Sequence, residues 1–306
     1  MVDLATLLSD WPTLVRVLTK RVELIPSDDE RASTWRRIGE AKRDMLDDAQ
    51  GATEAYERAL DLEPESAFTL DNLIPLYEAK NDAARLVDLY RRRIELCGED
   101  DEGLKLQLLL DAAERYEKGL GERREAIQAL TEALEVRPES VDVLERLGAL
   151  YETEGMFAEL HENLRARAGL EADPDKRRAL KKRVGGLLAK ELDDPAQALV
   201  AYSDVLAMGF DADAIAAIRA IGEAREELRH EAAESVTGIL LAEGKYAELV
   251  DVLELRLRAE TEPFDRARTL RQIAEYCENR VESPDRALGA LLRSLAEEPG
   301  DAPERY

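Results

Sequence analysis

Four segments of this chain repeat one residue pattern, and this repetition restricts the possible folds more than any other feature. Anchored on a leucine in each copy, the segments are offset by 74, 72 and 89 residues. They are ATEAYERALDLEPES (52–66), AIQALTEALEVRPES (126–140), AQALVAYSDVLAMGF (196–210) and ALGALLRSLAEEPGD (287–301). An internal period of this kind indicates a stack of similar units, each of which buries its apolar face against its neighbours.

Each copy carries small residues at two fixed places. An alanine stands eight residues before each leucine anchor, and a glycine or alanine stands 21 residues before it. Apolar residues follow at helical spacing between these places. Small residues at one level let two helices approach closely, so each copy predicts an antiparallel helix pair. The positions are Ala52, Ala126, Ala198 and Ala287, and Gly39, Ala113, Gly185 and Ala274.

Helix boundaries are marked within each pair. The second helix is predicted to begin at an N-cap residue, twice followed by proline, and to end before a proline in three copies. The starts are Asp48, Asp194-Pro195 and Ser283-Pro284, and the ends are Pro64, Pro138 and Pro299. Pro75 falls inside a predicted helix and is expected to kink it.

A second, shorter hairpin alternates with the first. Its copies are 70–96, 144–170 and 233–259, with the latter part of an earlier copy at 5–24.

These residues resemble the tetratricopeptide repeat. Leu144, Leu147, Gly148 and Tyr151 fit the first helix of that motif, and Ala52, Tyr56, Ala59 and Pro64 fit its second. The sequence departs from the motif at Ile74, which replaces the glycine, and at Leu160 and Leu249, which replace the second-helix alanine. The resemblance implies an all-α, right-handed superhelical solenoid of antiparallel helix hairpins.

The repeats predict one continuous domain over residues 1–306. Its super-repeats span approximately 1–66, 67–140, 141–210 and 211–301. The last contains about 17 additional residues, which predict either an extra helix near 211–229, with Ile215, Ile218, Ile221 and Gly222 on its apolar side, or two helices merged into one. Met1 to Ser9 and GDAPERY (300–306) read as interrupted repeats, so we expect a segment of a longer protein.

Composition excludes several classes of protein. With 67 acidic and 43 basic residues the net charge is -24, which disfavours a nucleic-acid binder. No apolar run is long enough to cross a membrane, and the N-terminus lacks the basic start of a signal sequence. Cys97 and Cys277 are expected to be reduced thiols in a cytoplasmic protein. Only 10 of the 43 basic residues are lysine, which favours a GC-rich bacterial source.

The sequence predicts no enzyme, no cofactor and no metal site. Gly119-Leu120-Gly121 and Gly185-Gly186 lack the context of a phosphate loop and fall at predicted helix-packing positions. His161 is expected at the surface or in a groove and His230 at a helix start. Aspartate pairs such as Asp193-Asp194 are expected to cap helices.

An arginine recurs at the repeat offsets. Arg21, Arg93, Arg167 and Arg256 occupy one level of the repeat. We expect each guanidinium to bridge carboxylates on the adjacent hairpin; the alternative is a row of ligand-binding arginines.

A basic segment, KRRALKKR, stands out from the acidic chain. Its cations are Lys176, Arg177, Arg178, Lys181, Lys182 and Arg183, and Arg266, Arg268 and Arg271 are expected to extend it. One interpretation is a solvated face paired with Glu171, Asp173 and Asp175. The other is an anion-receiving patch for an acidic peptide tail.

Together these features predict a scaffold or adaptor that binds a peptide or helix of a protein partner. The acidic surfaces elsewhere favour basic partners. Alternatives are a regulatory or sensor arm of a larger, multidomain or membrane-associated protein and, opposed by the charge, an RNA-associated helical repeat. End-to-end self-association is a further expectation.

Overall fold

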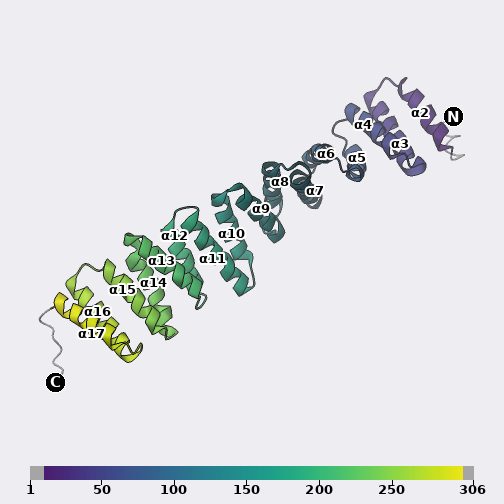
Figure 1. Ribbon diagram of the computed structural model, residues 1–306. Helices are drawn as coiled ribbons and strands as arrows, with labels where there is room; N and C mark the ends of the chain where they lie inside the picture. The colour runs from purple at the N-terminus through teal and green to yellow at the C-terminus, as the bar shows by residue number, and fades with distance from the viewer. Residues whose placement is uncertain (1–9, 299–306) are drawn as a thin grey trace. The chain divides into compact units, whose positions relative to one another are not determined.

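The computed structural model describes residues 10–298, and every regular element in that range is a helix (Figure 1). The expected all-α fold of antiparallel helix hairpins is confirmed. Backbone packing divides the chain into two compact units, one that runs to Leu150 and one that begins at Tyr151. The division falls inside helix α9 (Val141–Glu154).

Unit 1 is a stack of helices joined by short turns. Before α9, each α-helix packs against the next α-helix along the chain. Before α9, its elements are α2 (Trp11–Val22), α3 (Asp28–Leu46), α4 (Ala49–Leu62), α5 (Ala67–Lys80), α6 (Ala83–Glu95), η1 (Glu99–Asp101), α7 (Glu102–Glu114), η2 (Arg115–Leu120) and α8 (Arg123–Val136).

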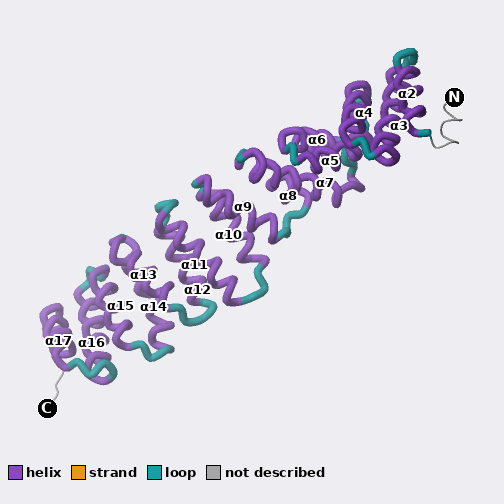
Figure 2. Tube along the Cα trace, turned by 45° about the vertical axis from the view of Figure 1, so that its right-hand side comes forward, coloured by secondary structure: helices purple, strands orange, loops and turns teal. Residues whose placement is uncertain are grey.

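Unit 2 continues the same alternation of helices and turns, as the tube in Figure 2 shows. Its elements are α10 (Phe157–Leu170), α11 (Pro174–Lys190), α12 (Pro195–Leu206), α13 (Ala212–Ala224), η3 (Glu226–Leu228), α14 (Arg229–Ala242), α15 (Tyr246–Ala259), α16 (Pro263–Asn279) and α17 (Pro284–Glu297).

The long hairpins are closely packed because small residues lie where the helices meet. Ala52 of α4 and Ala198 of α12 are fully buried. A Cβ atom built on Gly39 of α3 would lie 2.9 Å from the ring of Tyr56, and one on Gly185 of α11 would lie 2.9 Å from the ring of Tyr202. The glycines therefore make room for a tyrosine ring on the second helix.

Side chains cap the second helices at the predicted places. The Asp48 carboxylate accepts a hydrogen bond from the Gly51 amide at 2.8 Å, and the Asp194 carboxylate accepts one from the Gln197 amide at 3.0 Å. Ser283 precedes α17, but its hydroxyl makes no capping hydrogen bond. These contacts satisfy amides that a helix start would leave unpaired.

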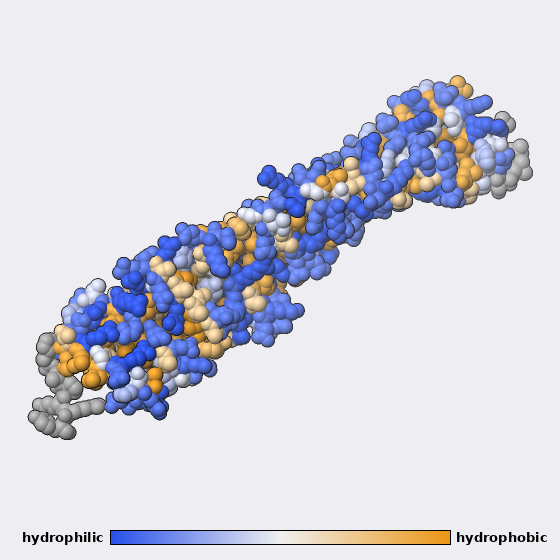
Figure 3. Space-filling model, in the orientation of Figure 1, coloured by the Kyte–Doolittle hydropathy of each residue, from blue (hydrophilic) through white to orange (hydrophobic). Residues whose placement is uncertain are grey.

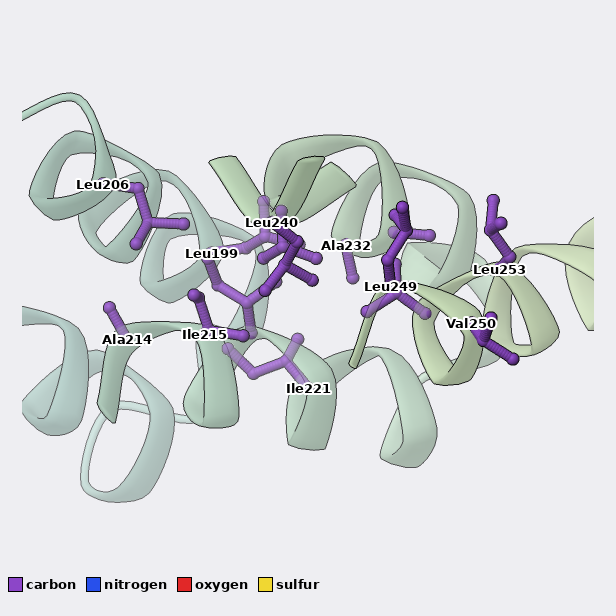
Figure 4. Packing of buried hydrophobic residues seen from close by; sticks show 14 of the residues in the cluster. Leu199, Leu206, Ala214, Ile215, Ile221, Ala232, Leu240, Leu249, Val250 and Leu253 are labelled. Carbon is purple, nitrogen blue, oxygen red and sulfur yellow. The ribbon is translucent and has the colours of Figure 1, made fainter. Parts of the chain in front are cut away.

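A separate helix, α13, lies between α12 and α14. Ile215, Ile218 and Ile221 are buried on one side of it, and they join a core formed with Leu199 of α12 and Leu249 of α15 (Figure 4). The extra residues of this super-repeat thus form a helix of their own with a complete apolar face.

Helix α5 runs through Pro75 as one element. The expectations for Met1 to Ser9, Pro299 and residues 300–306 lie outside the described residues.

Candidate functional site

Three consecutive helices of unit 2 line an open groove with a volume of about 570 Å³. Helices α10 and α12 form its walls, and α11 lies between them. Volumes of this size, about 300–1,000 Å³, are typical of sites that hold a ligand. The lining residues are His161, Arg165, Ala168, Gly169, Arg177, Lys181, Val184, Leu188, Gln197, Val200, Ala201 and Asp204.

The apolar part of the lining comes mostly from α11 and α12. Val184 and Leu188 belong to the buried core, whereas the Val200 side chain is 55% exposed. Hydrophilic residues cover most of the face seen in Figure 3, and apolar residues reach it in separate patches. An apolar lining with a few charged groups at its rim is the usual composition of a ligand groove.

Charged side chains line the rim of the groove. Lys181 forms an ion pair with Asp204 at 2.8 Å, and the side chain of Arg165, 62% exposed, lies 3.9 Å from Glu162 on its own helix. The Arg177 guanidinium donates hydrogen bonds of 2.9 and 2.7 Å to the Glu171 carbonyl at the end of α10. His161 lies in the groove with its Nδ1 3.2 Å from a Glu162 oxygen.

The predicted basic segment does not form one patch, because α11 presents its cations on two sides. Arg177 and Lys181 line the groove. Arg183 pairs with Glu152 at 2.6 Å, and Arg178 donates to the Met208 carbonyl.

Lys182 is the most completely paired cation of the segment. Its ammonium lies 3.1 Å from Asp211 and 2.9 Å from Asp213, and these contacts raise its pKa. Burial opposes ionisation of the Asp211 carboxyl, but hydrogen bonds from the Ala214 amide and Lys182 lower its pKa. Lys176 is exposed and has no carboxylate within salt-bridge distance among residues 10–298.

The three arginines expected to extend the patch have acidic partners within unit 2. Arg266 pairs with Glu297 at 2.8 Å and donates to the Leu257 and Glu260 carbonyls, Arg268 pairs with Asp265 at 3.0 Å, and Arg271 pairs with Glu298 at 2.6 Å.

The recurring arginines do not share one arrangement. The buried Arg93 guanidinium donates to Asp71 on α5, its partner helix in the same hairpin, at 2.7 Å. Arg256 pairs at 2.9 Å with the buried Glu260 at the end of its own helix. Arg167 is half-buried and Arg21 is exposed.

Residues considered for chemistry have packing or solvent roles. Gly119 packs against the Ala83 methyl group, and His230 is exposed beside Glu234. Cys97 and Cys277 are free thiols whose pKa values are raised by burial, which disfavours the reactive thiolate. Within the described range, no cluster of His, Cys, Asp or Glu is placed to hold a metal ion, and no helix is long and apolar enough to cross a membrane.

Sequence reasoning missed the walls of the groove. No motif contains Arg165, Val200 or the pair Ala168-Gly169. The only signal that could have indicated them is a small or exposed residue at the repeat offsets. At the positions of Ala168-Gly169, the preceding super-repeat has the larger Ile94 and Glu95.

No protein-family model and no curated protein sequence matches this chain. Among solved structures, it is similar to YrrB, described as a TPR protein with an unusual peptide-binding site (17% identity, 66% of this chain and 96% of that chain, TM-score 0.36). It is also similar to a tetratricopeptide repeat protein from Parabacteroides merdae (14% identity, 96% of each chain, TM-score 0.35) and to MamA (18% identity, 58% and 91%, TM-score 0.34).

Proposed function

We propose that this protein is a non-catalytic interaction scaffold that holds a segment of a protein partner in the groove of α10, α11 and α12. The tetratricopeptide-like helical repeat fold on which the proposal rests is evident from the chain's own repeats and helix pairs. The observation that carries the proposal is the groove itself, an apolar floor between two helical walls with an exposed valine on one of them.

The proposed ligand is a peptide segment or helix because the groove is open along three helices. A segment laid between α10 and α12 would cover Val200 and the apolar floor of α11. Burial of apolar surface supplies about 25 cal/mol per Å², and the charged rim orients the ligand. Free thiols at Cys97 and Cys277 support a reducing, cytoplasmic setting, and the net charge of -24 opposes a nucleic-acid partner.

Peptide display tests this proposal without a known partner. Random 12-residue peptides are selected on the full chain, and the affinity of the best peptides is measured by fluorescence anisotropy. We expect Val200→Trp to fill the groove and weaken binding about tenfold or more, because it removes the space without changing charge. Leu241→Trp, at an exposed leucine of α14, is the matched control.

The proposal fails if the selected peptides bind Val200→Trp and the wild-type chain equally well. Circular dichroism of both variants establishes that any loss of binding does not come from unfolding.

End-to-end self-association is a second proposal, favoured by a specific observation. Leu288, Leu291, Leu292 and Leu295 form one exposed face of α17.

A further inference from the structure

The groove of α10, α11 and α12 has a positive rim in a strongly acidic protein. Its charged lining comprises Arg165, Arg177 and Lys181 against the single carboxylate of Asp204. The whole chain has a net charge of -24. A local excess of cations in such a chain needs a reason beyond composition.

These cations differ in how far their charge is compensated. The Arg177 guanidinium donates to a carbonyl, which is a neutral acceptor and leaves the positive charge in place. No carboxylate of the described residues lies within salt-bridge distance of it. Arg165 approaches only Glu162, at 3.9 Å, and both side chains are mostly exposed. An exposed pair at this distance contributes little.

The opposite side of α11 provides a comparison on the same helix. There Lys182 has two carboxylate partners, and Arg183 pairs with Glu152. Lys182 and Arg183 are thus neutralised by acidic side chains on the side that faces away from the groove. On the groove side, Lys181 is paired with Asp204, whereas Arg165 and Arg177 keep most of their positive charge uncompensated.

In the following super-repeat, an ion pair bridges the helices at the corresponding place. Glu254 and Arg293 stand 89 residues after Arg165 and Asp204, and they form a two-fold ion pair of 2.9 and 3.1 Å between α15 and α17. Arg286 adds a second pair with Asp251 at 3.1 Å. No such pair joins Arg165 to Asp204.

Unit 1 shows a third solution at the corresponding place. Arg91, 74 residues before Arg165, lies over the Tyr116 ring with its guanidinium carbon 5.2 Å from the ring centre. The position that corresponds to Tyr116 in the groove of unit 2 is Leu188. Arg165 therefore has neither an ion pair to the opposite helix, as Glu254 has with Arg293, nor an aromatic ring beneath it, as Arg91 has with Tyr116.

We infer that the groove of α10, α11 and α12 selects an acidic segment of a protein partner. This inference rests on the proposed function and specifies its ligand. An aliphatic side chain of the segment packs on Val200 and the apolar floor, and its Asp or Glu carboxylates pair with Arg165 and Arg177. Guanidinium groups suit this task because they bind a carboxylate through two parallel hydrogen bonds.

Asp204 competes with the ligand for Lys181. In the free protein, the Asp204 carboxylate forms an ion pair with the Lys181 ammonium, at an N–O distance of 2.8 Å. A ligand carboxylate displaces it or binds beside it, against the repulsion of a like charge. Removing the charge of Asp204 should therefore strengthen the binding of an acidic segment, a gain that damage to the fold would not produce.

The test uses the peptides selected by display on the full chain. We expect the selected sequences to be enriched in Asp and Glu. Replacing these residues by Asn and Gln in the best peptide should weaken binding about tenfold or more, and raising the salt concentration should weaken binding of the acidic form.

Variants locate the charge effect. Arg165→Glu and Lys181→Glu should each weaken the binding of the acidic peptide about tenfold, and Asp204→Asn should strengthen its binding several-fold. Lys176→Glu is the matched control, because it makes the same charge change on α11 outside the groove lining. The affinity of Lys176→Glu for the acidic peptide should stay within about twofold of the wild-type value.

The outcomes separate the two proposals. If Val200→Trp abolishes binding but the amide peptide binds as well as the acidic one, the groove is the site and the inference of acidic selection is wrong. If Lys176→Glu weakens binding as much as Lys181→Glu, the effect is long-range and the inference is also wrong. If Val200→Trp has no effect, the proposed function itself fails. Selection of basic peptides overturns the inference directly.

Discussion

At the scale of single residues, glycine and tyrosine are matched in the long hairpins. Gly39 faces the ring of Tyr56, and Gly185 faces that of Tyr202. Where alanine replaces glycine, at Ala113 and Ala274, the corresponding residue of the second helix is a leucine, Leu130 or Leu291. The buried Leu130 thus replaces the tyrosine where alanine replaces the glycine, as close packing requires, whereas Leu291 of α17 remains 38% exposed.

Gly39→Ala should destabilise unit 1. The added methyl group would lie 2.9 Å from the ring of the fully buried Tyr56, so the ring or the helix would have to shift. We expect a loss of about 1–3 kcal/mol in the free energy of unfolding, measured with urea. Gly238→Ala, on an exposed part of α14 where a Cβ meets nothing within 4 Å, should instead gain about 0.5–1 kcal/mol. A gain at both positions would contradict the packing argument.

Tyr56 should make the fold sensitive to alkali. Burial raises the pKa of Tyr56 to about 12, and burial and Glu57 raise that of Tyr77 to about 12. The unfolded side chains ionise near pH 10, so they lose protons first and stability falls between about pH 10 and 12. In Tyr56→Phe, we expect a smaller fall over this range, by about 2 kcal/mol, in urea titrations.

The same variant has a control at neutral pH. The Tyr56 hydroxyl has no hydrogen-bond partner among the described residues. Tyr56→Phe should therefore leave stability at pH 7 within about 1 kcal/mol of the wild-type value. An equal pH dependence of the two proteins above pH 10 would show that Tyr56 ionises as readily in the folded state.

At the scale of elements, capping separates two kinds of helix start. Asp48→Ala and Asp194→Ala should each cost about 1 kcal/mol, because each carboxylate accepts a hydrogen bond from a helix amide. Ser283→Ala should cost only a few tenths, since its hydroxyl makes no such bond. The Gly51 amide lowers the pKa of Asp48, so this contribution is present above about pH 4 and is lost as the carboxylate is protonated. Equal costs at all three positions in urea unfolding at pH 7 would rule out this explanation.

Helices were predictable from the sequence because their determinants are local. Small residues at fixed spacing, N-cap residues and prolines predict α3, α4, α11 and α12, and all of these signals lie within or beside the helix that they define. The apolar side of α13 was also readable from Ile215, Ile218 and Ile221. The sequence did not decide whether residues 211–229 form a separate helix, because two helices and one long helix have the same local pattern.

The site was less predictable because its character depends on partners distant in sequence. Six cations in KRRALKKR suggested one surface, but Lys182 finds its acids 29 and 31 residues later and Arg183 finds Glu152 31 residues earlier. Only the neighbours three or four positions away are apparent from a helical sequence. The groove is also lined by two small residues, Ala168 and Gly169, which carry no chemical signal in the sequence.

At the scale of the whole molecule, apolar surface at the end of unit 2 opposes the repulsion of a net charge of -24. The Leu288 and Leu292 side chains of α17 are 58% and 60% exposed. Their counterparts in helix α12 are Leu199 and Ser203, and Leu199 is only 1% exposed, in a core shared with α13. The face of α17 thus corresponds to one that a further helix covers elsewhere in the unit.

We expect this face to support self-association that strengthens with salt. Salt screens the repulsion between acidic chains and leaves the contact between leucines intact. The same salt weakens the binding of an acidic peptide in the groove. In sedimentation velocity, the mean mass should therefore rise with protein concentration, more steeply at 0.5 M than at about 0.05 M salt. Leu288→Glu with Leu292→Glu should restore the monomer, and Leu241→Glu should not. A wild-type chain that stays monomeric at high salt, or a double variant that associates as before, would contradict this role for α17.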